Sequence, residues 1–135
     1  MRFRVGIIVF LALMAPFNLT AGGVSVKYMF EQCQPLSQKG FKAETLEDLV
    51  CFKTIETVVS ASKSACMWFK YAKDDGRETN MLTVMHMASE AEDTEAAIQA
   101  FLNWARTEPQ YWDNIMTDLQ SKWLFPNWPC RVDLH

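Results

Sequence analysis

Several residue classes are scarce in this chain of 135 residues. It has five Gly and five Pro, too few for a collagen-like or low-complexity protein. Its 13 Lys and Arg stand against 16 Asp and Glu, with no basic block, so the sequence excludes a nucleic-acid-binding protein. Half of the residues are hydrophobic and 13% are aromatic, which argues against disorder. The length predicts one domain.

The N-terminus has the pattern of a secretory signal peptide over residues 1–23. Arg2 and Arg4 precede an apolar stretch over residues 5–17, which is shorter than the roughly 20 apolar residues of a membrane-spanning helix. Ala21 and Gly23 suit cleavage after Gly23, and cleavage after Ala21 is the alternative. Removal leaves 11 basic and 16 acidic residues, a net charge of −5. No second apolar run of spanning length follows, so we expect residues 24–135 to be soluble, away from the membrane, in an oxidising compartment.

Apolar residues at helical spacing predict an all-α fold, a small single-domain bundle of four to five helices. The longest predicted helix runs from residue 46 to 72 without Gly or Pro, behind a capping-box pattern of Thr45 and Asp48. The five tryptophans are expected mainly in the core, with one or two at an interface. The other expected elements are a helix over 24–33, a loop over 34–43, a charged turn over 73–79, a short helix over 80–88, a helix capped by Thr94, and a helix from Pro109 with a stripe from Trp112 to Trp123.

Four cysteines, an even number, predict two disulfides in an oxidising compartment. Cys51 and Cys66 would lie about 22 Å apart along an unbroken helix, whereas a disulfide needs Cα atoms within roughly 7 Å. That excludes Cys51–Cys66 as long as the helix is unbroken. Of the remaining pairings, Cys33–Cys51 with Cys66–Cys130 is favoured, because Cys33 ends one predicted helix and Cys51 opens the next.

The chain offers little catalytic chemistry. Its two histidines are His86 and the terminal His135, and no Gly-rich phosphate loop or CxxC zinc pattern is present. His86 near Ser89 lacks a third partner, and His86 between Met85 and Met87 is more often a structural residue than a copper ligand. We therefore expect no enzyme, no metal site and no cofactor.

Two charged segments are candidates for binding. The first is the turn Asp74, Asp75, Gly76, Arg77 and Glu78, between two predicted helices. The second is the acidic stretch of Glu90, Glu92, Asp93 and Glu95. Either segment can instead be an ordinary solvated loop. The carboxylates of the acidic stretch could also serve only to interact favourably with the dipole of the following helix.

The C-terminal half resembles the type VI secretion amidase immunity (Tai) family and its Rap relatives. The resemblance rests on the segments 96–109 and 113–119 and on the ending from Phe125 to Cys130, together with the signal peptide and the places of Cys33 and Cys51. The sequence departs from the family where Lys53 and Thr54 replace a Gly-Tyr pair and where the third cysteine is Cys66.

The resemblance implies a periplasmic immunity protein of a Gram-negative bacterium, without enzymatic activity. Its partner would be a type VI-secreted toxic effector, often a peptidoglycan amidase, which the protein inhibits by occluding the active-site cleft. Family members are helical and often form homodimers. The turn around Gly76 is then the candidate inserting element, and the acidic stretch is the alternative contact. The alternative function is a periplasmic helical binding or chaperone-like protein without a toxin partner.

Overall fold

The computed structural model describes residues 23–78 and 80–132, and only the backbone of residues 81, 82 and 86. Within the described part the chain is helical and has no β-strand, which confirms the predicted all-α fold. The signal-peptide prediction lies outside the described residues, apart from Gly23. The elements are α1 (Val26–Gln38), α2 (Leu46–Asp74), α3 (Met81–Met87), α4 (Thr94–Thr107) and α5 (Gln120–Trp123), with 3₁₀ turns η1 (Pro109–Tyr111) and η2 (Met116–Leu119).

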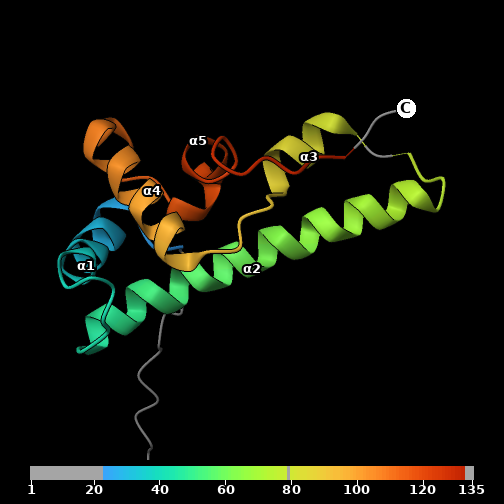
Figure 1. Ribbon diagram of the computed structural model, residues 1–135. Coiled ribbons are helices and arrows are strands. Elements are labelled where there is room, and N and C mark those ends of the chain that lie inside the picture. Colours follow the sequence, from blue (N-terminus) through green and yellow to red (C-terminus); the bar gives the residue numbers. More distant parts are fainter. Residues whose placement is uncertain (1–22, 79, 133–135) are drawn as a thin grey trace, which may run out of the picture.

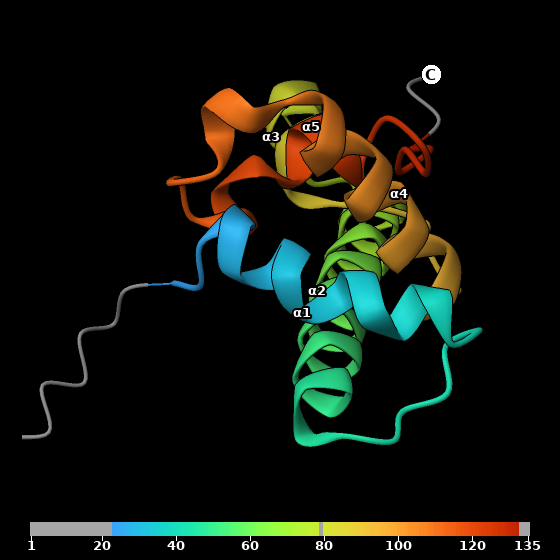
Figure 2. The same ribbon diagram turned by 90° about the vertical axis from the view of Figure 1, so that its left-hand side faces the viewer.

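The fold is organised along α2. This helix begins at the predicted capping box: Thr45 Oγ1 accepts from Asp48 N at 3.2 Å, and Asp48 Oδ2 accepts from Thr45 N at 3.0 Å. Its 29 residues give a length of about 43 Å. In Figure 1 α1 and α4 lie at one end of α2 and α3 lies over the other, and Figure 2 shows α1 crossing α2.

Two hydrophobic clusters divide α2 into an inner half (Leu46–Ser62) and an outer half (Lys63–Asp74). The larger cluster joins the inner half to α1, α4 and residues 116–125. In it, Phe101 contacts Trp123 edge-to-face, with ring centroids 5.3 Å apart. The smaller cluster, beneath α3, consists of Cys66, Phe69, Val84, Ala88 and Val132.

The predicted disulfide pairing is confirmed. Cys33–Cys51, with Cα atoms 5.1 Å apart, ties α1 to the inner half of α2. Cys66–Cys130, with Cα atoms 5.6 Å apart, ties the C-terminal segment (residues 124–132) to the outer half of α2. The two disulfides indicate an oxidising, extracytoplasmic environment. Among the described helices, none combines the length and apolar character needed to cross a membrane.

The first helix was predicted too short, because α1 continues through Pro35 to Gln38. Pro35 lies near the end of the helix, and Leu36, one residue later, is completely buried in the larger cluster. Burial of Leu36 outweighs the single backbone hydrogen bond that Pro35 cannot donate. The helix ends where Gly40 adopts φ 64° and Phe41 N donates to Leu36 O at 3.0 Å.

The predicted helix from Pro109 to Trp123 is wrong. Residues 109–123 instead form η1, a turn over residues 112–114, a single bridge residue at Ile115, η2 and the short α5. Ile115 forms an isolated antiparallel bridge with Ser25, in the chain entering α1: Val26 N donates to Asn114 O at 2.9 Å and Met116 N to Val24 O at 2.9 Å. Such pairing satisfies backbone donors that open the first turn of α1 and that no intrahelical bond can satisfy.

Candidate functional site

The charged turn closes the outer end of α2. Gly76 adopts φ 77°, its N–H donates to Lys73 O at 2.8 Å, and Arg77 N donates to Ala72 O at 2.8 Å. This double hydrogen bond is the Schellman ending of a helix, in which glycine is favoured at the left-handed position. The backbone of the turn is therefore fixed by the helix that precedes it.

All five residues of the turn are exposed. Arg77 Nε lies 3.1 Å from Asp75 Oδ2, and the two side chains remain 60% and 49% exposed. Asp74 and Glu78 add two further carboxylates, so the turn presents both signs of charge at the end of α2 farthest from α1 and α4 (Figure 1). An ion pair this exposed is weak and can exchange partners on binding.

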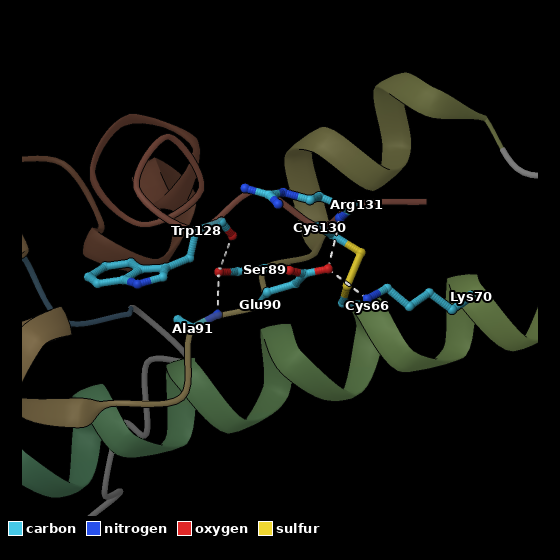
Figure 3. Close-up of a disulfide and its surroundings, with 8 residues drawn as sticks. All are labelled: Cys66, Lys70, Ser89, Glu90, Ala91, Trp128, Cys130 and Arg131. Carbon is cyan, nitrogen blue, oxygen red and sulfur yellow. Dashed lines mark hydrogen bonds and ion pairs between the residues drawn. A yellow bond between two sulfur atoms is a disulfide. The ribbon is translucent and has the colours of Figure 1, made fainter. Parts of the chain in front are cut away.

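Three side chains of the acidic stretch, those of Glu90, Glu92 and Asp93, are already engaged within the protein. Glu90 Oε1 accepts hydrogen bonds from Lys70 Nζ at 2.6 Å and from the backbone N–H of Arg131 at 3.1 Å (Figure 3). The bond from Lys70, followed by that from Arg131, lowers the pKa of the Glu90 carboxyl. Glu90 therefore joins α2 to the C-terminal segment beside the Cys66–Cys130 disulfide.

Glu92 and Asp93 have structural partners as well. Glu92 Oε1 accepts from Lys63 Nζ at 2.7 Å, and this hydrogen bond lowers the pKa of Glu92. Asp93 Oδ1 accepts from the N–H groups of Glu95 and Ala96, at 2.9 and 3.2 Å, and so caps α4. The prediction that Thr94 caps this helix was wrong; Thr94 is its first residue. Asp93 takes that role because its carboxylate also interacts favourably with the helix dipole.

Ser89 has a structural role that sequence reasoning missed. Its side chain is completely buried; Oγ donates to Trp128 O at 2.7 Å and accepts from Ala91 N at 3.1 Å (Figure 3). The adjacent backbone makes two further bonds, Ser89 N to Ser62 O and Glu90 N to Trp128 O. With both hydroxyl bonds engaged, Ser89 serves as the junction of three chain segments. Its neighbours in sequence give no signal of this, because Ser62 and Trp128 lie 27 and 39 residues away.

The acidic stretch also forms one wall of an open cavity of about 490 Å³. Lys63 and Lys70 of α2 also line the cavity, so it is bordered by two ion pairs, Lys63 with Glu92 and Lys70 with Glu90. Among the residues that the structure describes, no group of three His, Cys, Asp or Glu side chains is placed to hold a metal ion. The acidic stretch therefore serves mainly to join chain segments within the protein. The turn, whose five residues are exposed, is the better placed of the two candidate segments to contact a partner.

The two segments are neighbours without forming one site. Asp74 of the turn and Arg131 of the C-terminal segment line a small cavity of about 280 Å³ together with Lys70 and Lys73. Lys70 is thus shared, since it also binds Glu90.

Comparison with family models, curated proteins and solved structures finds no match to this chain.

Proposed function

We propose that this protein is a periplasmic immunity protein that binds a type VI-secreted toxic effector and occludes the active-site cleft of that effector. The resemblance to the Tai and Rap immunity proteins implies that the effector is a peptidoglycan amidase. The observation that carries the proposal is the exposed turn from Asp74 to Glu78 at the outer end of α2. A cleft can be blocked by a narrow, convex element, and this turn is the narrow end of a long helix.

The turn is held in place before any partner arrives. Its backbone is fixed by the Schellman hydrogen bonds, and the helix beneath it is anchored by Cys66–Cys130. An element that is already ordered loses less conformational freedom on binding, which supports high affinity for an interface of modest size. Asp74, Asp75, Arg77 and Glu78 can hydrogen-bond to polar groups that line a catalytic groove.

The net negative charge of the protein would favour binding to an effector that is basic. The chain without residues 1–23 carries −5, so a basic effector would be attracted over a distance. Attraction of this kind raises the association rate more than it lowers the dissociation rate. Binding through the turn and steering by the whole protein can therefore be separated by kinetics.

The test replaces Asp74, Asp75, Arg77 and Glu78 by Ser and measures binding to secreted effectors of the producing strain. A matched control replaces Arg106, Glu108, Asp113 and Asp118 by Ser. The control set has the same composition of charges and lies in α4 and the segments after it, away from the turn. Both variants change the net charge equally, so any loss of steering is common to both.

If the turn inserts into the cleft, its variant dissociates faster at low and at moderate salt, and the control differs from the unaltered protein only in association rate at low salt. In cells, the turn variant then fails to protect against the effector and the control protects. Equal binding by the two variants would contradict insertion of the turn.

The alternative, a helical binding or chaperone-like protein, has one observation in its favour. An apolar cavity of about 300 Å³ lies between α3 and the C-terminal segment, lined mainly by Met85, Ala88, Phe125, Pro126 and Pro129. It could hold an apolar side chain of a peptide. A protein that delays aggregation of unrelated unfolded chains, and that neither binds nor neutralises any effector of its own strain, would favour this alternative.

A further inference from the structure

The two disulfides differ in how far solvent can reach them. Cys33 and Cys51 are completely buried in the larger cluster. Cys66 is 2% exposed, whereas its partner Cys130 is only partly buried. In thiol–disulfide exchange a thiolate must reach one of the two sulfur atoms, so the rate depends on access. Of the four cysteines, Cys130 is therefore the most open to attack.

The apolar cavity of about 300 Å³ between α3 and the C-terminal segment borders Cys130. None of the residues that line it is charged: they are Met85, Ala88, Ser121, Phe125, Pro126, Pro129 and Cys130. A cavity of this size is at the lower end of those that hold small organic molecules. Its walls place no carboxylate in the path of a thiolate, so a small uncharged thiol can enter and ionise near Cys130.

The cavity that borders Cys66 differs from it in charge. Figure 3 shows the disulfide between α2 and the C-terminal segment, with Lys70 and Glu90 beside it. This second cavity, of about 490 Å³, is lined by two lysines and three acidic residues, Lys63, Lys70, Glu90, Glu92 and Asp93. Three carboxylates against two ammonium groups repel an approaching thiolate, and Cys66 itself is almost completely buried. Attack on Cys130 from the apolar cavity is therefore favoured over attack on Cys66.

We propose that Cys130 is a thiol-exchange site, at which an uncharged thiol that enters through the apolar cavity forms a mixed disulfide and releases Cys66. The thiol reacts as its thiolate, having lost its proton to solvent, and its sulfur bonds to Cys130 Sγ. The Sγ–Sγ bond breaks, and its electron pair goes to Cys66, which leaves as a thiolate and takes up a proton from solvent. One disulfide replaces another, so no further oxidant or reductant is needed. A dithiol goes one step further, because its second thiolate releases Cys130 as well.

Exchange at Cys130 removes the covalent tie between the C-terminal segment and the outer half of α2. The ties that remain are the hydrogen bonds from Ser89 Oγ to Trp128 O, at 2.7 Å, and from Arg131 N to Glu90 Oε1, at 3.1 Å, and the burial of Val132 in the smaller cluster. The site therefore couples thiol chemistry to the order of the C-terminal segment and α3. This inference goes beyond the proposed function and is tested without an effector.

The first test treats the folded, disulfide-bonded protein with 2-mercaptoethanol, without denaturant, and quenches samples with N-ethylmaleimide at a series of times. Peptide mapping by mass spectrometry identifies the group on each cysteine. The first product should carry mercaptoethanol on Cys130 and maleimide on Cys66. Cys33–Cys51 should react at least about tenfold more slowly, because a thiolate reaches it only after the larger cluster opens. Mercaptoethanol first on Cys66, or equal rates for the two disulfides, overturns the proposal.

The second test identifies the route of the thiol. Met85 lines the apolar cavity and Met67 lines the cavity beside Cys66, and the two side chains are 58% and 62% exposed. Met85→Trp narrows the apolar cavity and should slow exchange at least about threefold, whereas Met67→Trp, the matched control, should leave the rate unchanged. Circular dichroism verifies that both variants are folded. An unchanged rate for Met85→Trp, or equal slowing by Met67→Trp, overturns entry through the apolar cavity.

Discussion

The inner half of α2 packs against α1 and α4, whereas the outer half packs against α3 and the C-terminal segment. Around the inner half lies the large hydrophobic cluster. Around the outer half lie a small cluster and the ion pairs of Lys63 with Glu92 and of Lys70 with Glu90. The inner half of α2 therefore belongs to the larger hydrophobic cluster. The outer half has a smaller cluster and is held to the C-terminal segment by the Cys66–Cys130 disulfide. Most of the buried hydrophobic residues lie at the inner end, whereas the outer end carries the exposed side chains of Met67, Trp68 and Tyr71 and the charged turn.

The largest expected effect comes from the inner cluster. Phe101→Ala removes a fully buried ring that packs on Trp123, and we expect a loss of about 3–5 kcal/mol of unfolding free energy. Phe69→Ala in the outer cluster should cost less, because its neighbours can adjust or open locally. Urea denaturation of both variants measures the difference. A larger loss for Phe69→Ala than for Phe101→Ala would reverse the comparison of the two ends.

Removal of one disulfide should affect the ends differently. Replacing Cys66 and Cys130 by Ser should cost about 2–4 kcal/mol and should also free α3 and the C-terminal segment locally. Replacing Cys33 and Cys51 by Ser should lower global stability by a similar amount without local opening, since α1 stays packed in the large cluster. Hydrogen exchange by mass spectrometry distinguishes the two. Faster exchange over residues 81–88 in both variants would show that the inner bridge also holds the outer end.

The capping box of α2 predicts a pH dependence for the inner end. Asp48 is buried and accepts from Lys39 Nζ at 2.9 Å and from the N–H groups of Glu44 and Thr45. The Lys39 hydrogen bond, with those of the backbone, lowers the pKa of Asp48 from 3.8 to about 2. The unfolded chain therefore takes up this proton first, so the stabilisation is complete above about pH 4 and is lost as pH falls to about 2.

Asp48→Asn should accordingly be less stable than the unaltered protein at neutral pH, with a difference that shrinks below pH 4. Glu47→Gln, at the exposed neighbouring position, is the control and should change stability little. Thermal unfolding at a series of pH values measures both. A difference for Asp48→Asn that stays constant from pH 7 to pH 2 would mean that the lowered pKa contributes nothing.

The smallest effects are expected along the acidic stretch. Asp93→Ala removes the cap of α4 and should cost about 1 kcal/mol. Glu92→Gln breaks an exposed ion pair with Lys63 and should cost less, with an effect that disappears at high salt. Chemical denaturation at two salt concentrations tests both. Should Glu92→Gln prove the more costly change at high salt, the contact with Lys63 would be more than a surface ion pair.

Signals close together in the sequence predicted α2 and the bridges well. The capping box lies within four residues, and the uninterrupted helix excluded Cys51–Cys66 by its length alone. The turn at Gly76 was equally predictable, because glycine after a helix marks a left-handed ending. The capping box and the turn depend on neighbouring residues, and the bridges, 18 and 64 residues long, were narrowed by the length of one helix, so these causes can be found without knowing the fold.

Features that depend on distant partners were not predictable in the same way. The stripe from Trp112 to Trp123 has helical spacing, yet the backbone there pairs with the chain entering α1. Glu90 and Glu92 looked free because Lys70 and Lys63 lie 20 and 29 residues earlier. The place of the charged turn after the long helix was therefore predicted correctly, while the contacts of Glu90 and Glu92 with α2 emerged only from the tertiary structure.

Hydrogen exchange of the protein alone and in complex with its effector tests most directly whether the outer end of α2 is the functional end. The proposed function predicts slower exchange over residues 72–78 in the complex, with little change in α1 and α4. Protection over the inner end, or over residues 89–95 without the turn, would contradict it.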